Sequence, residues 1–480
     1  MVHCGRSTPT QHNFGSLLIS SPQGHSGKTV VAIGLCGALR RKGFSVQPFK
    51  KGPDYIDPSW LTLAAGRNCR NLDLFLVPVD RLIPHYQKTC QDANMAIVEG
   101  AMGLYDGLTS PESWTTAEIA RLFNLPVLLV VNTTRMTGSI AAMVMGYQRF
   151  QPEVPIEGVI LNYVSGSRHE QKLRSAVEKY CRLPVVGSIP RDLGLTISER
   201  HLGLVPSREW KESESLVEKI VERLEPHLDL NQILTIAKRF KIPGRSVGDQ
   251  NEQEKPKKNR SRKVKIGVIF DSVFHFYYPE NLEALSQEGG ELIFINSLHD
   301  RLPEIDGLYI GGGFPEFFLS QLEANRRLRE DIHQAIEEGL PCYTECAGLM
   351  YLCQSIHWQN RSYEMVGIIP ASVEWSSKPK GHGYVMAEVV RENPFYPVGT
   401  ILRGHEFHHS KLSFSNRLDC LYQIRRGNGI DGQRDGILYK NMVASYTHVH
   451  ALGTPKWAEA FVSLAAREGF NQVSLKAVEA

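Results

Sequence analysis

The residues with the most readable chemistry lie in "SPQGHSGKT", residues 21–29. A glycine-containing loop followed by Lys28-Thr29, between an apolar run and an apolar helical stretch, is typical of a phosphate-binding loop. In such a loop, backbone N–H groups face the phosphates, the lysine reaches the β/γ oxygens and the threonine hydroxyl holds Mg²⁺. The usual first glycine is replaced by Pro22, which removes one N–H donor. We still expect a nucleotide site, built from Gly24, Ser26, Gly27, Lys28 and Thr29.

A Mg²⁺–nucleotide site also needs carboxylates, and two apolar runs are followed by them. Glu99 ends "MAIVE", and Asp54 and Asp57 lie in "FKKGPDYIDP". Because ligands collect beyond the carboxyl ends of parallel strands, these acids are candidate metal ligands. We predict that Mg²⁺ is held by Thr29, Asp54 and Glu99.

The same "FKKGPDYIDP" segment crowds cations and an aromatic ring beside the expected γ-phosphate. Such a cluster is unusual for a plain turn, and it suits an anionic substrate. We expect substrate contacts from Lys50, Lys51 and Tyr55.

A second chemical centre is expected around Cys346 in "LPCYTECAGLMYLCQSI". The cysteine stands between a short strand and an apolar helix expected over "LMYLCQSI", with Ala347 and Gly348 permitting a tight turn. This is the arrangement of a nucleophile elbow, and a helix N-terminus favours the thiolate. Cys342 and Cys353 are expected to lie within the strand and the helix as packing residues.

A cysteine nucleophile needs a histidine from elsewhere in the chain. His448 and His450 end a late strand in "VASYTHVH". The strand "LYIGGG" ends in glycines, and we expect the backbone N–H groups of Gly312 and Gly313 to form an oxyanion hole.

The segment "HEFHH", residues 405–409, matches the H-E-x-x-H pattern of zinc proteases. That pattern requires a helix that brings both histidines to one face. Gly404 precedes the segment and its flanks have strand and turn character. We therefore expect these residues to line a site for a polar or anionic ligand, or to pack, and not to bind zinc.

Two α/β regions must position these centres. Apolar runs of strand length alternate with helical stretches on both sides of a charged segment at 242–263, which reads as a linker. The runs before it are 16–20, 46–50, 95–100, 127–132, 158–164 and 185–190; those after it are 264–270, 291–296, 307–313 and 340–345. We expect one domain over 14–225, a helical tail and flexible linker over 226–263, and a second domain over 264–475.

Bulk composition narrows the class of protein. The 480 residues carry 54 basic and 51 acidic side chains, a net charge of +3 that argues against a nucleic-acid partner. No apolar run is long enough to span a bilayer, and the N-terminal region has no signal-peptide pattern. Nine cysteines without a C-x-x-C pair fit a reducing compartment. We expect a cytoplasmic protein.

The motifs together resemble the cobyrinic acid a,c-diamide synthase family of glutamine-dependent tetrapyrrole amide ligases. The resemblance covers nearly the whole chain, through these stretches: "SGKT", "QPFKKGPDYIDP", "RNLD", "VEGAMGLYDG", "GVILNYVSGSRH", "SIPRD", "ERHLGLVP", "YYPENLEAL", "DGLYIGGGFPE", "ECAGLMYL", "RGHEFHHS" and "SYTHVH". It implies a dethiobiotin-synthetase-like P-loop domain joined to a flavodoxin-like class I glutamine amidotransferase domain.

The resemblance also implies roles for single residues. Cys346 would be the glutaminase nucleophile, activated by His448, and Asn162 would help to bind ATP. Two departures concern the elbow: Ala347 stands where the family more often has glycine, and His450 stands where many glutaminases have a glutamate. The third member of the triad is therefore left open.

The implied reaction uses ATP, Mg²⁺ and L-glutamine to amidate the a- and c-acetate groups of cobyrinic acid through an acyl phosphate. Siroheme and nickel-sirohydrochlorin are alternative substrates, since both are anionic tetrapyrroles; "FKKGPDYIDP" and "RMTGSIAAMVMGYQ" resemble the siroheme-amidating relatives somewhat more closely. One hypothesis for the assembly is that two copies of the chain form a homodimer. A partition-type switch ATPase is the rival from another class, but it has an extra lysine early in the loop, where this chain has "SPQGHS".

Overall fold

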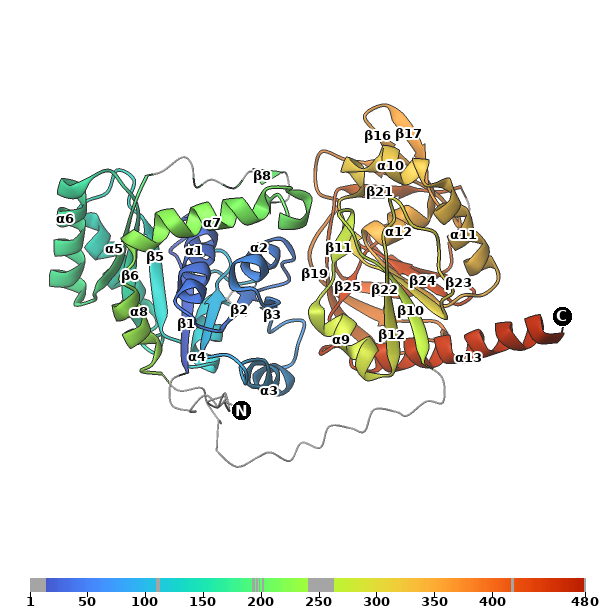
Figure 1. The fold of residues 1–480 in the computed structure, drawn as a ribbon, viewed down its shortest axis with the longest axis horizontal. Helices are drawn as coiled ribbons and strands as arrows, with labels where there is room; N and C mark the ends of the chain where they lie inside the picture. The colour runs from blue at the N-terminus through green and yellow to red at the C-terminus, as the bar shows by residue number, and fades with distance from the viewer. Residues whose placement is uncertain are drawn as a thin grey trace, which may run out of the picture. The chain divides into compact units, whose positions relative to one another are not determined.

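A computed structural model describes residues 14–108, 113–191, 195, 197, 199–200, 203–240, 263–415 and 418–478. The chain divides into two compact units (Figure 1). The first comprises Met1–Leu74 and Val79–Gly248, and the second comprises Phe75–Pro78 and Asp249–Ala480. The expected linker at 242–263 lies, except for its last residue, outside the described residues.

The first unit is built on a seven-stranded parallel sheet in the order β3-β2-β4-β1-β5-β6-β7. Its strands are β1 Gly15–Ser20, β2 Val46–Lys51, β3 Arg70–Leu72, β4 Met95–Glu99, β5 Val127–Asn132, β6 Ile156–Val164 and β7 Val185–Pro190. Six of them coincide with the apolar runs of the sequence. The exception, β3, has three residues, too few to show a pattern. Because β4 lies between β1 and β2, the segments that follow these three strands meet at one edge of the sheet.

Helices cover both faces of this sheet, as parallel strands require. They are α1 Lys28–Arg41, α2 Ile56–Ala65, α3 Val79–Thr89, α4 Thr116–Leu122, α5 Ser139–Phe150, α6 Ser167–Ala176, α7 Ser213–Leu224 and α8 Leu230–Ala237. Helix α1 packs closely on α7: a Cβ at Gly37 would lie 2.2 Å from Val221 Cγ2. Helix α8 contacts β1 and β7 and buries Ile233 and Ile236 in the same core. The first core thus includes chain beyond residue 225.

The second unit is built on a ten-stranded mixed sheet in the order β12-β10-β13-β15-β24-β23-β22-β19-β20-β25. Its first five strands are parallel and the later pairs are antiparallel. The parallel strands are β10 Val264–Ile269, β12 Gly290–Ile295, β13 Gly307–Ile310, β15 Cys342–Glu345 and β24 Met442–Ser445. The others are β19 Gly381–Val389, β20 Ile401–His408, β22 Cys420–Arg426, β23 Arg434–Tyr439 and β25 His448–Val449.

Helices α9 Pro279–Gln287, α10 Leu319–Ala324, α11 Arg326–Glu337, α12 Ala347–Leu352 and α13 Lys456–Val478 complete this unit with two smaller sheets. One pairs β11 Phe274–Phe276 with β14 Gly312–Gly313; the other joins β16 Cys353–Trp358, β17 Arg361–Glu364, β18 Ile369–Trp375 and β21 Ser410–Ser413. The prediction of one helix through "LMYLCQSI" is wrong at its second half, because the helix ends at Leu352 and Cys353 begins β16. Apolar runs of this length cannot by themselves be assigned to helix or strand.

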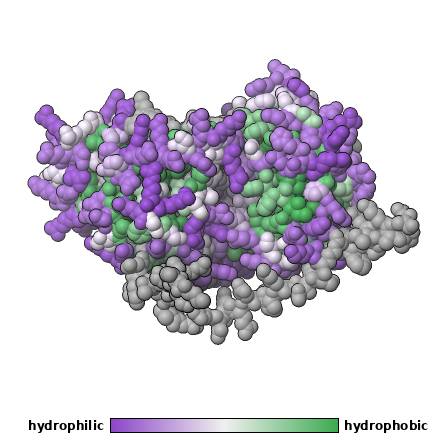
Figure 2. All heavy atoms as spheres, in the orientation of Figure 1, coloured by the Kyte–Doolittle hydropathy of each residue, from purple (hydrophilic) through white to green (hydrophobic). Residues whose placement is uncertain are grey.

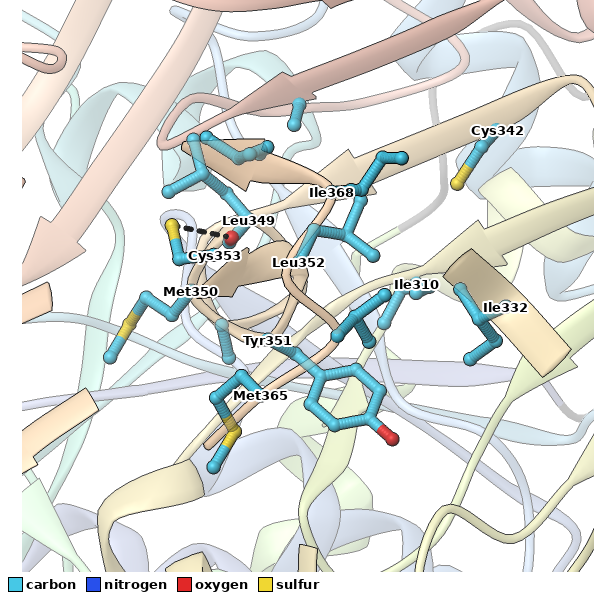
Figure 3. Close-up of a cluster of buried hydrophobic side chains, with 14 of the residues drawn as sticks. Ile310, Ile332, Cys342, Leu349, Met350, Tyr351, Leu352, Cys353, Met365 and Ile368 are labelled. Atoms are coloured by element: carbon cyan, nitrogen blue, oxygen red, sulfur yellow. Dashed lines mark hydrogen bonds between the residues drawn. The ribbon is translucent and has the colours of Figure 1, made fainter. Parts of the chain in front are cut away.

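The short helix α12 lies in an apolar cluster with strands β13 and β15 and helix α11 (Figure 3). Cys353 donates to the Leu349 carbonyl at 3.4 Å, and Cys342 is buried on β15. Both thiols are buried packing groups of this cluster.

Hydrophilic side chains predominate on the face shown in Figure 2, with smaller hydrophobic areas in each unit. Within the described residues no helix is both long and apolar enough to cross a membrane.

Candidate active sites: a phosphate loop and a cysteine triad

The phosphate loop connects β1 to α1 and is held by a neighbouring strand. Gly27 precedes α1 with φ 86°, a left-handed conformation that glycine adopts without strain. A Cβ there would lie 2.3 Å from Asn162 Nδ2, and that amide donates to the Ser26 carbonyl at 2.9 Å. The start of α1 has no side-chain cap, so its first N–H groups can face an anion. Asn162, at the end of β6, therefore lies against the loop.

The Lys28 side chain folds back onto the loop. Its Nζ donates to Ser21 Oγ at 2.9 Å and lies 3.5 Å from the Gln23 carbonyl oxygen. Burial, together with the nearby charge of Lys50, lowers the pKa of Lys28 to about 8. A bound phosphate would place negative charge beside this ammonium and stabilise its protonated form, so the position favours anion binding.

Pro22 keeps its segment in place through its carbonyl group. The Tyr147 hydroxyl, from α5, donates to the Pro22 carbonyl at 2.7 Å. The Leu104 N–H donates to the carbonyl of the preceding Ser21 at 2.9 Å. Supports from two other segments thus hold the loop at the position where the usual glycine is missing.

Thr29, Asp57 and Glu99 form one cluster with Lys50 at the edge where β1, β2 and β4 end. Thr29 Oγ1 donates to Glu99 Oε1 at 2.6 Å and lies 3.4 Å from Asp57 Oδ2. Lys50 Nζ lies 2.5 Å from Asp57 Oδ2 and 2.9 Å from Glu99 Oε1. Burial alone would lower the pKa of Lys50, but the carboxylates of Asp57, Glu99 and Asp54 raise it above its ordinary value. Lys50 is therefore a buried ammonium held by these acids.

Asp54 has a different local role from the one that its spacing suggests. Its Oδ1 accepts from the N–H groups of Ile56 and Asp57 at 2.8 and 3.2 Å, so it caps the start of α2. Its Oδ2 lies 3.9 Å from Lys50 Nζ. Burial, and then the charge of Asp57, raises the pKa of Asp54 to about 7. Asp57, not Asp54, is the aspartate with a contact to Thr29, and it was absent from the predicted ligand set.

The residues of the cluster fit a magnesium ion. Glu99 Oε2 is buried and has no hydrogen-bond partner among the described residues. Carboxylate and hydroxyl oxygens are the donors that Mg²⁺ takes beside nucleotide phosphates. Thr29 and Glu99 from the predicted set, with Asp57 added, would hold the ion.

The other two predicted substrate residues lie in the same segment. Lys51 ends β2, and burial lowers its pKa although the charge of Asp73 opposes this. Tyr55 is the residue directly before α2. Asn71, on β3, fixes the segment between them by donating to the carbonyls of Gly52 and Asp54 at 2.8 and 2.7 Å. This explains why the stretch "RNLD" accompanies "FKKGPDYIDP".

In the second unit Cys346 occupies a strained turn between β15 and α12. Its φ of 49° and ψ of −104° are rare for a residue with a side chain, and such strain is typical of nucleophile elbows. Its N–H donates to the Ser445 carbonyl at 2.7 Å. Gly348 is needed here, because a Cβ would lie 2.5 Å from the Ile310 carbonyl oxygen. Neighbouring strands thus hold the elbow on both sides.

Cys346, His448 and Glu345 form a triad. His448 shares a hydrogen bond with Cys346, and its Nδ1 lies 3.4 Å from Glu345 Oε2. Glu345 also accepts from the Val449 N–H at 3.1 Å and from the Tyr309 hydroxyl at 3.2 Å. Burial would lower the pKa of His448, but the bonds to Cys346 and Glu345 raise it to about 10. The arrangement suits a thiolate–imidazolium pair oriented by a carboxylate.

Glu345 was missed because it directly precedes the nucleophile. The position two residues after the histidine, where many glutaminases have a glutamate, is occupied by His450, whose Nε2 lies 3.6 Å from Glu280 Oε2. In a strand, successive side chains point to opposite faces, so the residue before a nucleophile is not expected to share its site. The strained turn at Cys346 changes that direction. The sequence does offer a signal for this third member of the triad: Glu345 is an acidic residue immediately before Cys346.

The glycine run after β13 lies beside the triad. A Cβ at Gly312 would lie 2.6 Å from His448 Cε1, so this position admits no side chain. Gly313 pairs with Phe274, and a Cβ there would lie 1.7 Å from the Val273 carbonyl oxygen. The N–H of Ala347, first in α12, is a further donor without an intrahelical partner. Gly312 thus lies next to His448, and an oxyanion hole formed by these backbone groups stays a prediction.

The "HEFHH" segment lies along a strand, where the two histidines of the pattern, His405 and His409, are four residues and therefore ~13 Å apart along the chain, too far to share one zinc ion. His405 is in β20 and His409 directly follows that strand, and within the described residues no group of three or more acidic, histidine or cysteine side chains could hold a metal. The Glu406 carboxylate instead accepts from the N–H groups of Asn428 and Gly429 at 2.6 and 2.7 Å.

Comparison with known proteins assigns a domain family to each of the two regions. Residues 17–205 match a CobQ/CobB/MinD/ParA nucleotide-binding domain, and residues 265–456 match a CobB/CobQ-like glutamine amidotransferase domain. A cobyrinate a,c-diamide synthase from Magnetococcus marinus is 43% identical over 92% of this chain and 95% of its own length. Proteins of the same name from Archaeoglobus fulgidus (40%, over 94% and 98%) and Methanosarcina acetivorans (36%, over 97% and 98%) are also similar.

A solved structure, PurLQS from Thermotoga maritima, covers 44% of this chain and 100% of its own at 16% identity, but its TM-score of 0.34 is too low to carry an argument. The family is shown by the relatives named above, which are 36–43% identical over 92–97% of this chain. The predicted architecture, a P-loop nucleotide-binding domain followed by a glutamine amidotransferase domain, is confirmed. The chain is a glutamine-dependent ligase and belongs to the cobyrinate a,c-diamide synthase family.

Proposed function

We propose that the protein amidates the a- and c-acetate carboxylates of cobyrinic acid, with ATP as the activating co-substrate and L-glutamine as the nitrogen source. The observation that carries the proposal is the Glu345–His448–Cys346 triad in a chain whose relatives over more than 90% of its length are named cobyrinate a,c-diamide synthase. A triad of this kind releases ammonia from glutamine. A phosphate loop with a carboxylate cluster then supplies the activation that amide formation requires.

The glutaminase half-reaction takes place at Cys346. The thiolate attacks the glutamine side-chain amide, and backbone N–H groups of Gly312, Gly313 and Ala347 stabilise the tetrahedral oxyanion. The imidazolium of His448 gives its proton to the leaving nitrogen, so that ammonia departs and a thioester remains. Water, deprotonated by His448, hydrolyses the thioester to glutamate and restores the thiol.

The ligase half-reaction takes place at the phosphate loop. A substrate carboxylate attacks the γ-phosphorus of ATP, giving an acyl phosphate and ADP; ammonia then attacks the acyl carbon and phosphate leaves. Gly24, Ser26 and Gly27 present N–H groups to the phosphates, Lys28 reaches the γ-phosphate, and Asn162 keeps the loop in shape. Magnesium, held by Thr29, Glu99 and Asp57, would neutralise phosphate charge. Lys51 and Tyr55, with Lys50 released from its acids, would contact the anionic substrate.

The first test separates the two half-reactions with Cys346→Ala. We expect glutamine-driven amidation to fall by at least ~10³-fold, because the nucleophile is gone, while free ammonia still supports the reaction. Cys342→Ala, which removes a buried thiol from β15, the strand that precedes Cys346, is the matched control and should keep both activities. Undiminished glutamine-driven synthesis in Cys346→Ala would refute the assignment.

The second test identifies the substrate. Cobyrinate, siroheme and nickel-sirohydrochlorin are offered separately with ATP, Mg²⁺ and glutamine, and the products are weighed by mass spectrometry. We expect two successive mass decreases of about one unit each, acid to amide, with cobyrinate. Amidation of siroheme alone would replace the substrate but keep the chemistry. Glutamine hydrolysis by the purified protein, which a switch ATPase lacks, excludes the rival class.

A further inference from the structure

His405, from the "HEFHH" segment that the reaction did not use, lies directly against the catalytic histidine. Strand β20 pairs antiparallel with β25, and His405 and His448 are register partners. Their rings are stacked, with centroids 4.8 Å apart and planes at 16°. Gly404 allows this approach, since a Cβ there would lie 2.4 Å from the His448 carbonyl oxygen. The ring of His405 therefore covers one face of the His448 ring.

The surroundings of His405 keep its ring uncharged. It is only 5% exposed, and its Nδ1 lies 3.3 Å from the Tyr278 hydroxyl. Burial, and then the charges of His448 and His450, hold the pKa of His405 well below its ordinary value. An uncharged aromatic face next to a cation is attractive when both are removed from water.

The other groups around His448 act on the edge of its ring. Cys346 and Glu345, from the β15–α12 elbow, hydrogen-bond to the ring, and Tyr309 on β13 acts through Glu345. On the far side of Tyr278, His450 lies 3.6 Å from Glu280 of α9. The edge is thus fixed by the triad, and the face is fixed by His405.

We propose that His405 is a positioning residue of the glutaminase: its stacked, uncharged ring holds His448 between Cys346 and Glu345 and stabilises the imidazolium. The proposal rests on the glutaminase assignment of Cys346 and His448. It gives "RGHEFHHS" a function that the zinc-protease pattern does not.

The test compares His405→Ala with His405→Phe in the full chain. The alanine variant removes the stacked face, and we expect kcat for glutamine hydrolysis to fall about tenfold to a hundredfold, with KM nearly unchanged. We also expect the alkaline limb of the pH profile to move down by about one pH unit, because the imidazolium loses its aromatic neighbour. The phenylalanine variant keeps the face and should recover most of the rate and of the pH profile.

Two further variants separate positioning from folding. Tyr278→Phe removes only the hydroxyl beside His405, and we expect a smaller change in the same direction. His382→Ala removes a histidine on β19 whose ring is tilted against Phe407, with centroids 4.5 Å apart, and does not stack on His448, and it should change neither kcat nor the pH profile. The unfolding transition of the second unit, measured by calorimetry on the full chain and retained in all four variants, reports that this unit is folded.

The proposal is overturned if His405→Ala keeps the wild-type pH profile, if the shift is upward, or if His405→Phe loses as much activity as His405→Ala. A failure of the glutaminase assignment itself looks different. In that case Cys346→Ala would retain glutamine hydrolysis, whatever the His405 variants do.

Discussion

The nucleotide site and the cysteine site differ in whether residues of the chain alone satisfy the polar groups of the site. At the phosphate loop, Lys28 donates back to Ser21, Lys50 is held by two acids, and one oxygen of Glu99 has no partner among the described residues. At the elbow, Cys346 is hydrogen-bonded to His448, and His448 is hydrogen-bonded to Glu345. At the first site the charges are balanced by side chains of the chain itself, whereas at the second the proposed nucleophile, histidine and carboxylate are joined by hydrogen bonds.

The difference follows from what each site must stabilise. Phosphates and a divalent ion bring large charges, so a site that receives them must tolerate their absence as well. Glutamine is a neutral amide, and its reaction needs donors and a thiolate fixed in advance. Substitutions in the first site should therefore respond to ligands, and those in the second should not.

The largest expected effect is that of Lys50→Met on stability. Lys50 is 5% exposed at its side chain and compensates Glu99, which is fully buried, and Asp57. Removing one partner of a buried ion cluster costs about 3–5 kcal/mol. We expect the unfolding transition of the first unit, measured by calorimetry on the full chain, to fall in temperature by about 2–4 °C for each kcal/mol. Excess Mg²⁺ should recover part of the loss, because the ion can take the place of the ammonium.

The control for this experiment is Lys51→Met, which removes the next lysine of β2 and has no hydrogen bond to Glu99 or Asp57 among those described. Its loss should be smaller and independent of Mg²⁺. Equal losses in the two variants, or equal responses to Mg²⁺, would contradict the view that Lys50 stands in for a metal ion.

The next effect is that of Glu345→Gln on the glutaminase. We expect kcat to fall by ~10²–10³-fold, because the amide neither orients His448 as the carboxylate does nor stabilises its charge. The pKa of His448 is raised to about 10, and removing the negative charge lowers it. Loss of activity at high pH should therefore begin closer to neutrality in the variant, as a pH–rate profile of glutamine hydrolysis would show.

The raised pKa of His448 also has a consequence for stability with a definite sign. Protonation of His448 favours the folded state fully below its ordinary pKa of about 6.5. That contribution is lost as the pH rises through about 10. Stability of the second unit should fall over this range in the wild type and less so in Glu345→Gln. Unfolding curves with parallel pH dependence in the two proteins would argue against a charged His448.

Sequence reasoning was most successful where a site is built from one short segment. The loop "SPQGHSGKT" carries its own signal because glycine, lysine and threonine act at fixed spacing along the chain. Sequence reasoning was less complete where the spacing of residues along the chain does not determine where their side chains point. Asp54 and Asp57 are three residues apart, and only the start of α2 decides that Asp54 caps the helix while Asp57 contacts Thr29.

The same limit explains what was missed in the second unit. Cys346 and His448 are recognisable by type and context, but Glu345 reaches its partner only because of the strained turn that follows it. The stacking of His405 on His448 depends on an antiparallel pairing between β20 and β25. The sequence around residues 405 and 448 does not predict that pairing, because tertiary packing decides which β strands pair.

The smallest expected effect concerns Pro22. Tyr147→Phe removes the hydroxyl that donates to the Pro22 carbonyl but keeps the ring, which is stacked on Tyr105 at 5.3 Å. A single neutral hydrogen bond contributes about 0.5–1.5 kcal/mol, so nucleotide affinity, measured by calorimetric titration, should weaken only a few-fold.

Tyr105→Phe is the matched control for that variant. It removes a hydroxyl that donates to the Tyr147 carbonyl at 2.6 Å, one step further from the loop, and it should weaken nucleotide binding less. Glutamine hydrolysis without nucleotide should be unchanged in both variants, because both tyrosines belong to the first unit and the cysteine site belongs to the second. If both variants weaken nucleotide binding equally, α5 would support the loop through the packing of the Tyr147 ring and not through its hydroxyl. A specific loss in Tyr147→Phe would show instead that the loop, lacking its first glycine, depends on this donor from α5 for its shape.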